Sequence, residues 1–397
     1  MSNQRGLFLS HIAQTSPAPL MLEIDRAEGA YLYDPEGKPY LDLISGIGVS
    51  CLGHRHPAVI SAAKEQLDRY LHTLVYGEFV LSPQVRLAGL LADNLPAQLN
   101  NVYFVNSGTE ATEGAMKLAK RYTGRPEIIA SYNAYHGSTQ GSASLMNPTE
   151  FTQGYHPLLP GIRHIRFNQA EDLVNINNNT AAVIVETVQA ECGLQAPAGN
   201  YLRLLRDRCS ETGTLLILDE IQAGFGRTGS LWAFQQYGIV PDILLLGKAM
   251  GGGMPIAAFI ADKPVMSVIA HDPVLGHITT FGGHPVACAA AYANLSTLID
   301  SGLIEQVKTK ERLFLSRLRH PAVKAVRSAG LWLALEFESF DFLQAVIRNC
   351  LSRGLITDWF LFNSRSMRIG PPLTITIEEI EWACSVIIES IDAVAFS

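Results

Sequence analysis

The chain is predicted to fold as an α/β protein, in which helices cover both faces of a mainly parallel sheet. Six short apolar runs alternate with helical stretches between residues 101 and 261. Runs of this kind are typical of parallel strands that are buried on both faces. The chain has 397 residues, of which 48% are hydrophobic and 17% charged, so most of it should be folded. A chain of this length exceeds one ordinary core, and we expect a smaller second domain.

The N-terminal segment is predicted to begin the smaller domain. Residues 29–34 alternate between small or polar and apolar side chains, and the turn Pro35-Glu36-Gly37 follows them. Alternation next to a turn of this composition predicts a β-hairpin. We therefore assign residues 1–45 to the N-terminal part of the small domain.

The central segment, residues 46–285, is predicted to form the large domain. Its expected strands lie at 102–105, 128–131, 181–185, 214–218, 243–246 and 256–260. Continuous apolar runs of four or five residues favour a sheet that is covered by helices on both faces over a sheet with one solvent-exposed face.

The last segment, residues 286–397, is predicted to supply a connecting helix and the rest of the small domain. A helix is expected at 286–299, and strands are expected near 331–337 and 366–369. Because the pattern after the helix is α+β, we expect it to pack against the N-terminal hairpin, so that both termini form the smaller domain.

Charge and cysteine usage narrow the possible partners. The net charge is −7 and no run of Lys and Arg occurs, so neither nucleic acid nor an anionic membrane surface is an expected partner. The six cysteines are far apart and suggest reduced thiols, and no metal site is expected. No stretch resembles a signal peptide or a membrane span, so we expect a cytoplasmic protein.

Two predicted strands end in side chains with opposite charge. The strand at 214–218 runs into Asp219, and the strand at 243–246 runs through Gly247 into Lys248. In an open parallel sheet, ligands bind beyond the carboxyl ends of the strands. A carboxylate and an ammonium group are therefore expected to face one crevice.

A third strand is predicted to bring an anion site to the same edge. The strand at 102–105 is followed by Ser107, Gly108 and Thr109 and then by a helix expected at 111–121. Free N–H groups at a helix start, with small and hydroxyl side chains, suit a phosphate. A phosphate site, an aspartate and a lysine are together what pyridoxal 5'-phosphate requires, because the lysine forms an imine and the aspartate keeps the pyridine nitrogen protonated.

Some of these motifs also occur in other classes of protein. Residues 224–229, GFGRTG, match the dinucleotide fingerprint, but they lie several residues beyond a strand and no clear helix start follows, so a tight loop at the cleft is favoured. An ATPase is not supported, because no P-loop sequence occurs to accompany Asp219. His54 and His56 have no nearby third ligand, which favours a loop over a metal pair.

Four segments carry a family resemblance: FVNSGTEATEGAMKLA, LLILDEIQAGFGRTG, LLLGKAMGGGMPIAAF and TTFGGHPVACAAA. Together they resemble the class III aminotransferases, which are fold type I pyridoxal-phosphate enzymes, and the similarity extends over nearly the whole chain. Within that class, AAVIVETVQAECGL and YGIVPDILLLGKA are most similar to the acetylornithine and ornithine aminotransferase branch.

The resemblance implies roles for the cofactor residues. Lys248 would carry the cofactor as a Schiff base and shuttle the proton, and Asp219 would pair with the pyridine nitrogen. The further implied contacts are Ser107, Gly108 and Thr109 at the phosphate, Gln222 near the phenolic oxygen, Tyr135 stacked on the ring, and His136 and Glu186 behind it. Thr280 would reach the phosphate in a neighbouring subunit, which implies a homodimer with shared active sites.

The resemblance also implies how substrates bind. Arg368 would hold the α-carboxylate of glutamate, and Glu191 would neutralise that arginine when the other substrate is present. Two simpler interpretations stay open, because Arg368 and Glu191 could form only a structural ion pair and Tyr135 could be a packing residue. The implied reaction is a ping-pong transfer of an amino group from N-acetylornithine to 2-oxoglutarate.

Two positions depart from the branch. Ser138 stands where these enzymes usually have an arginine for the far carboxylate of the substrate, and Ile47 stands where ornithine enzymes tend to have a tyrosine. A lost charge-assisted contact is worth about 1.5–3 kcal/mol, which is enough to change substrate preference. Donors such as 4-aminobutyrate, another ω-amino acid or a diamine are therefore an alternative, and a pyridoxal-phosphate aminomutase is an alternative of another class.

Overall fold

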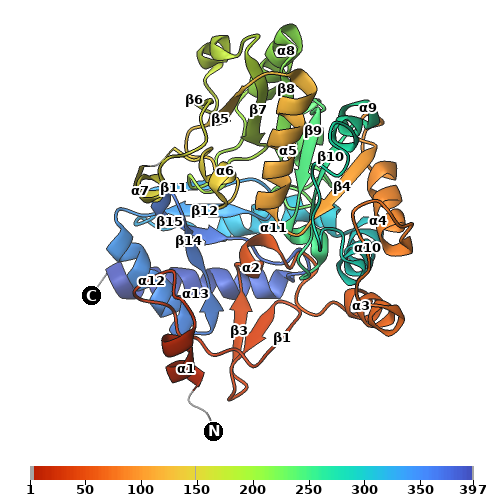
Figure 1. Cartoon of the computed structure of the whole chain (residues 1–397). Helices are drawn as coiled ribbons and strands as arrows, with labels where there is room; N and C mark the ends of the chain where they lie inside the picture. Colours follow the sequence, from red (N-terminus) through yellow and green to blue (C-terminus); the bar gives the residue numbers. More distant parts are fainter. Residues whose placement is uncertain (1–3, 148, 396–397) are drawn as a thin grey trace.

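The computed structural model describes residues 4–147 and 149–395, and it is a layered α/β structure with three sheets (Figure 1). The largest sheet occupies the upper part of Figure 1, and both termini lie in the lower part, around the two smaller sheets. Within the described ranges, no helix has the length and apolar character needed to cross a membrane.

The large sheet has seven strands in the order β4-β10-β9-β8-β7-β5-β6. Only β10 runs antiparallel to its neighbours. The strands are β4 (Asn101–Val105), β5 (Glu127–Ser131), β6 (Ile162–Ile165), β7 (Thr180–Glu186), β8 (Leu215–Asp219), β9 (Ile243–Leu246) and β10 (Ala257–Ala261). Every residue of β7, β8, β9 and β10 is buried, which explains why these strands are uninterrupted apolar runs.

Helices cover both faces of this sheet. Successive strand residues point to opposite sides, so Ile128 packs in the cluster that contains α5 (Gly108–Thr123), whereas Ile129 packs in the cluster on the other face. That second face is covered by α4 (Ser82–Asp93), α8 (Tyr201–Thr212) and α10 (Pro285–Asp300). The two buried clusters fix the sheet between the helix layers.

The two smaller sheets join the ends of the chain. The first has the order β1-β2-β3-β13, and the second has the order β11-β12-β15-β14. Their strands are β1 (Arg26–Glu28), β2 (Tyr31–Tyr33), β3 (Pro39–Asp42), β11 (Ala325–Ser328), β12 (Leu333–Glu336), β13 (Leu355–Ile356), β14 (Asp358–Phe360) and β15 (Asn363–Ile369). Because β13 pairs with β3, the C-terminal segment packs against the N-terminal hairpin as the sequence predicted.

The remaining helices lie at the edges and between the sheets. They are α1 (Gln4–His11), α2 (Ser45–Gly48), α3 (Pro57–Arg69), α6 (Gln140–Ala143), α7 (Thr149–Thr152), α9 (Lys263–Met266), α11 (Leu303–Arg317), α12 (Phe340–Ser352) and α13 (Ile377–Ala395). Five 3₁₀ turns complete the set: η1 (Gln153–Tyr155), η2 (Ala170–Asn175), η3 (Ala233–Tyr237), η4 (Lys248–Gly251) and η5 (Ser267–Ala270).

The structure confirms the predicted α/β class and all six predicted strands of the large sheet, with ends that shift by at most one residue. It adds β6, which the sequence analysis missed. It also corrects the expected position of the loop at 224–229. Arg227 in that loop is buried and donates to the carbonyls of Leu331 and Pro371, so the loop packs against the C-terminal segment instead of lining the cleft. The proposed domain boundaries at 45 and 285 stay predictions.

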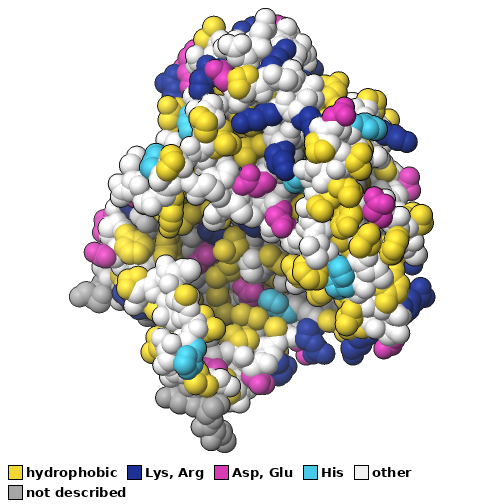
Figure 2. Space-filling model, in the orientation of Figure 1, with side chains coloured by type: hydrophobic (Ala, Val, Ile, Leu, Met, Phe, Trp, Pro, Cys, Tyr) yellow, Lys and Arg dark blue, Asp and Glu magenta, His cyan; other side chains and the backbone are white. Residues whose placement is uncertain are grey.

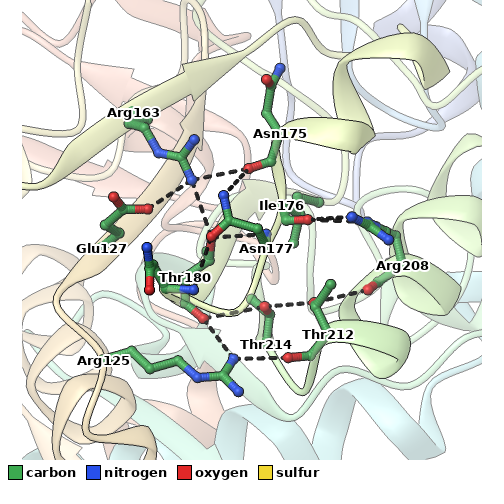
Figure 3. Close-up of polar contacts among 11 residues, drawn as sticks. Arg125, Glu127, Arg163, Asn175, Ile176, Asn177, Thr180, Arg208, Thr212 and Thr214 are labelled. Carbon is green, nitrogen blue, oxygen red and sulfur yellow. Dashed lines mark hydrogen bonds and ion pairs between the residues drawn. The ribbon is translucent and has the colours of Figure 1, made fainter.

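Arginines bind free carbonyl groups at the amino ends of the parallel strands (Figure 3). Arg125 donates to the carbonyls of Thr180, at the start of β7, and of Thr212, at the end of α8. Arg163 pairs with Glu127 at 2.8 Å. Such contacts satisfy backbone acceptors that helix and strand ends leave open, so this edge stabilises the fold while the opposite edge is free for chemistry.

Candidate active site

The carboxyl edge of the large sheet brings Asp219 and Lys248 to one cavity. Asp219 is the last residue of β8, and Lys248 follows β9 and opens η4. Lys248 has a φ of 45°, which is a left-handed conformation that a residue with a side chain rarely adopts. Strained backbone of this kind is concentrated at functional sites, and here it sets the direction of the lysine.

The start of α5 forms the second wall of the cavity. Ser107 is the N-cap, and its hydroxyl and the Glu110 carboxylate form a reciprocal capping box, which accounts for the helix beginning here. A Cβ at Gly108 would lie 2.8 Å from Cδ1 of Ile221, so the helix start closely approaches the segment after β8. The Thr109 hydroxyl bonds Thr139 at 2.6 Å. The start of α5 therefore lies at the carboxyl edge of the large sheet, as the hypothesis of a phosphate site requires.

Asp219 is held rigidly by its neighbours. Its Oδ1 accepts a hydrogen bond from the Ile221 amide at 2.9 Å, and its Oδ2 lies 2.7 Å from His136 Nδ1. His136 Nε2 is buried and has no hydrogen-bond partner among the residues described. Glu186 accepts from the Tyr135 amide at 3.1 Å, and burial, with the nearby Asp219 charge, holds the pKa of Glu186 well above its usual range. Burial and the Asp219 charge therefore both disfavour ionisation of Glu186.

Arg368 reaches the cavity through Glu191. The Arg368 guanidinium binds both oxygens of Glu191, with distances of 3.1 and 3.0 Å, and both side chains are buried. Glu191 also accepts from the Leu361 amide at 2.8 Å and lies 3.4 Å from Gln222 Nε2. Arginine binds carboxylates in proteins and in ligands with this same bidentate geometry.

The cavity gathers most of the predicted site residues. It has a volume of about 310 Å³. Its lining consists of Ser107, Gly108, Thr109, Tyr135, His136, Gly137, Ser138, Glu186, Glu191, Asp219, Ile221, Gln222 and Lys248. Figure 2 shows the hollowed face of the molecule in the region below α6, with acidic and basic side chains around an apolar floor.

Three predicted residues lie outside the lining, and one of them is Arg368, which is buried behind Glu191. Thr280 is exposed, and its carbonyl accepts from His72 Nε2 at 2.7 Å. Ile47 is 40% exposed, although its neighbour Gly48 lies close to Gln222. The structure therefore does not bring Thr280 or Ile47 into the cavity of their own chain.

Burial lowers the pKa of the catalytic-lysine candidate, Lys248. Desolvation lowers the pKa of Lys248 to about 8, and the Glu191 carboxylate opposes this shift while Arg368 adds to it. A lysine with a lowered pKa supplies the neutral amine that attacks a carbonyl group near physiological pH.

These residues fit pyridoxal phosphate. A reactive amine on Lys248 suits its aldehyde, the fixed carboxylate of Asp219 suits its ring nitrogen, and the start of α5 suits its phosphate. A doubly covered parallel sheet with this set at its carboxyl edge defines a pyridoxal-phosphate-dependent enzyme.

The comparison with known families agrees and is more specific. The model of the family described as "Aminotransferase class-III" matches residues 12–391, so the chain belongs to the class III aminotransferases, which depend on pyridoxal phosphate. An acetylornithine aminotransferase of Methanopyrus kandleri is 40% identical over 371 residues, which are 92% of this chain and 93% of that protein. A putrescine aminotransferase of Pectobacterium atrosepticum is 41% identical over 370 residues, which are 88% of this chain and 77% of that protein.

Solved structures show the same fold. The ornithine aminotransferase of Toxoplasma gondii, described with partial occupancy of pyridoxal phosphate at its active site, superposes with a TM-score of 0.92 at 31% identity and covers 98% of this chain and 94% of its own. An omega transaminase of Pseudomonas jessenii has a TM-score of 0.92 at 26% identity and covers 100% and 99% of the two chains. The names of these relatives include different amine donors. The comparison therefore shows an aminotransferase reaction and does not identify the donor.

Sequence reasoning missed one charged residue beside the site. Asp358 of β14 lies 3.1 Å from Arg368 Nε. A carboxylate two residues after a buried strand could have drawn attention, yet only the pairing of β14 with β15 shows which side chain it meets.

Proposed function

We propose that the enzyme transfers an amino group from N-acetylornithine to 2-oxoglutarate. The observation that carries the proposal is the bidentate pair of Arg368 and Glu191 beside Lys248, because it lets one cavity serve two substrates of different charge. The 40% identity to an acetylornithine aminotransferase over nearly the whole chain supports this choice of donor.

The residues of the cavity divide the chemical work. Bound pyridoxal phosphate supplies an electron-accepting ring. Lys248, with its pKa lowered to about 8, binds the cofactor and moves the proton at the substrate carbon. Asp219 keeps a proton at the ring nitrogen, and His136 fixes the orientation of that carboxylate at 2.7 Å. Ser107, Gly108 and Thr109 hold the phosphate at the start of α5.

The two substrates use Arg368 in turn. The α-carboxylate of 2-oxoglutarate takes the two terminal nitrogens of Arg368 after Glu191 turns away from them. The donor binds while Glu191 stays on Arg368, so the buried guanidinium stays paired. Tyr135 and Gln222 line the same cavity, where Tyr135 would stack on the ring of the cofactor and Gln222 would lie near its phenolic oxygen.

An ω-amino donor such as putrescine or 4-aminobutyrate is the second candidate. The Ser138 hydroxyl lies 2.9 Å from the Tyr135 hydroxyl. It offers a neutral contact where acetylornithine and ornithine enzymes usually have an arginine for the donor carboxylate. The 41% identity to a putrescine aminotransferase also supports an ω-amino donor.

A donor panel separates these candidates. Purified holoenzyme is assayed for glutamate formation from 2-oxoglutarate with N-acetylornithine, ornithine, putrescine or 4-aminobutyrate as the only donor. The leading proposal requires the highest kcat/KM with N-acetylornithine, and a higher value with putrescine or 4-aminobutyrate replaces it. Turnover of an amino substrate without any 2-oxo acid would instead point to an aminomutase.

We also propose a cytoplasmic homodimer with shared active sites. Thr280 is exposed and lies outside the cavity of its own chain, which supports a contact with the neighbouring subunit's phosphate. Mixing Lys248→Ala chains with Thr280→Ala chains should then restore activity above that of either variant, because mixed dimers contain one intact site. Absence of any restoration in verified mixed dimers contradicts the shared site, and cell fractionation tests the compartment.

A further inference from the structure

Asp358 faces Arg368 across two paired strands. In the antiparallel register of β14 and β15, Asp358 stands directly opposite Arg368 and Trp359 stands opposite Met367. Directly opposed residues project to the same face of a sheet, so the register itself brings the two charges together. The resulting distance between Arg368 Nε and Asp358 Oδ1 is 3.1 Å, so the two groups form an ion pair, although neither atom has a hydrogen-bond partner among the residues described.

The two carboxylates around Arg368 contact different nitrogens. Glu191 binds the two terminal nitrogens of the guanidinium, which are the atoms that a substrate carboxylate also needs. Asp358 lies at Nε, which the substrate does not need, and the carbonyl of Trp359 accepts from one terminal nitrogen at 2.8 Å. Replacement of Glu191 by a substrate therefore leaves the contact with Asp358 in place.

Arg368 is too buried to lose all of its counter-charges. Its side chain is only 5% exposed, whereas that of Asp358 is 22% exposed. A buried cation without a partner is strongly destabilised, because neither water nor another charge compensates for it. During the exchange of Glu191 for a substrate carboxylate, Asp358 is the acidic side chain that still contacts Arg368 among the residues described.

We propose that Asp358 is a positioning residue that keeps the charge of Arg368 paired while Glu191 and the α-carboxylate of a 2-oxo acid exchange places. The proposal rests on the proposed function of Arg368 as the carboxylate site. Asp358 then accelerates the exchange, since it lowers the free energy of the state in which Glu191 has left and the substrate has not yet bound. Asp358 changes the equilibrium affinity for the 2-oxo acid much less, because its negative charge acts equally on the Glu191 carboxylate and on the substrate carboxylate.

The ionisation of Asp358 gives the exchange a pH dependence. The charged groups that act on Asp358 are Arg368, Glu191 and Asp42, and Asp42 itself pairs with His54 at 2.9 Å. Burial raises the pKa of Asp358 to about 6, and the attraction of Arg368 only partly offsets that shift. Below this pH the carboxyl is protonated and the contact with Arg368 loses its charge, so exchange should slow as the pH falls through about 6.

The test compares Asp358→Asn with its conservative counterpart Asp358→Glu. The acceptor kcat/KM of the holoenzyme is measured with 2-oxoglutarate, and the Kd of 2-oxoglutarate is measured by calorimetry without a donor. Asp358→Asn should lower kcat/KM about 10-fold while Kd changes less than about 3-fold, and Asp358→Glu should restore most of the rate. The decline in kcat/KM below pH 6 should disappear in Asp358→Asn.

Separate outcomes overturn the two proposals. If Arg368→Gln leaves the Kd of 2-oxoglutarate unchanged, Arg368 is not the carboxylate site and the proposed function itself fails. If Arg368→Gln weakens binding while Asp358→Asn keeps both the wild-type kcat/KM and its pH profile, only the role of Asp358 is overturned. Should Asp358→Asn not fold, a wild-type profile that stays flat through pH 6 overturns that role equally.

Discussion

His136 Nδ1 lies 2.7 Å from Asp219 Oδ2 inside the cavity, and both side chains are buried. The second oxygen of Asp219 is occupied by the Ile221 amide, so the carboxylate is fixed at both oxygens. A fixed carboxylate in a buried place stabilises a proton on a ring nitrogen better than a mobile one in water does. Asp219 and His136 therefore act as one unit in the proposed mechanism.

Replacement of Asp219 by Asn should lower kcat at least ~100-fold, because the ring nitrogen loses the charge that holds its proton. His136→Ala should cost less, about 10-fold, since it removes only the hydrogen bond that orients Asp219. Single-turnover kinetics with a saturating donor measure both losses. Wild-type kcat in Asp219→Asn, with the cofactor bound normally, contradicts the assignment.

The attachment of cofactor to Lys248 should depend on pH. Burial lowers the pKa of Lys248 to about 8, and only the neutral amine attacks, so the rate of covalent cofactor capture by the apoenzyme should rise as the pH rises through about 8. Lys248→Ala should abolish covalent capture altogether. The visible absorbance of the reconstituted protein and trapping by borohydride report the attachment.

Two variants provide opposite controls for that pH profile. Glu191 raises the pKa of Lys248 and Arg368 lowers it. Glu191→Gln should therefore move the midpoint of capture to lower pH, and Arg368→Gln should move it to higher pH. Identical midpoints in both variants would mean that neither charge reaches Lys248.

Local sequence patterns predicted those parts of the fold that are buried on both sides. The strands β7, β8 and β9 are continuous apolar runs because helices cover both of their faces. The edge strand β6, with the sequence IRHI, was missed because its central Arg and His are only half-buried and break the apolar run. Propensity alone does not distinguish such an edge strand from a loop.

Local patterns also predicted some residues of the candidate site and not others. Asp219, Lys248 and the start of α5 follow from strand ends that share one edge, which is a local argument. The pairing of Arg368 with Glu191 joins residues 177 positions apart, and only the family resemblance suggested it. Neither the strand-end argument nor the family resemblance predicted a role for Asp358. Its contact depends on the register of β14 with β15, where a bulge follows Trp359.

Ser138→Arg should direct the donor preference toward N-acetylornithine. The variant places a cation at the cavity wall beside Tyr135, where a donor carboxylate can bind it. A charge-assisted contact of about 1.5–3 kcal/mol corresponds to a gain of roughly 10- to 100-fold in kcat/KM. Putrescine should lose efficiency, because its ammonium group is repelled.

The matched control for this variant is Ser138→Gln, which adds length without charge. It should leave the ratio of the two donors close to that of the unmodified enzyme. If Ser138→Gln and Ser138→Arg change that ratio equally, then bulk and not charge at position 138 determines the donor.

Gly114 should be irreplaceable for a purely steric reason. It lies in α5, and a Cβ at this position would meet Cε1 of Phe259 at 2.4 Å, while the Phe259 ring is fully buried in β10. Gly114→Ala should therefore cost about 1–3 kcal/mol, because the ring or the helix must shift within a packed layer. The thermal midpoint of the cofactor-loaded protein should fall.

Gly89 in α4 offers the opposite case on the other face of the sheet. A Cβ there would meet no atom within 4 Å, and no left-handed backbone angle requires glycine. Gly89→Ala should therefore raise the thermal midpoint, because alanine favours a helix interior by up to about 1 kcal/mol over glycine. The two variants make the same chemical change in a helix, so opposite shifts measure the packing between α5 and Phe259. Equal shifts of either sign would show that this contact does not limit the stability of the sheet.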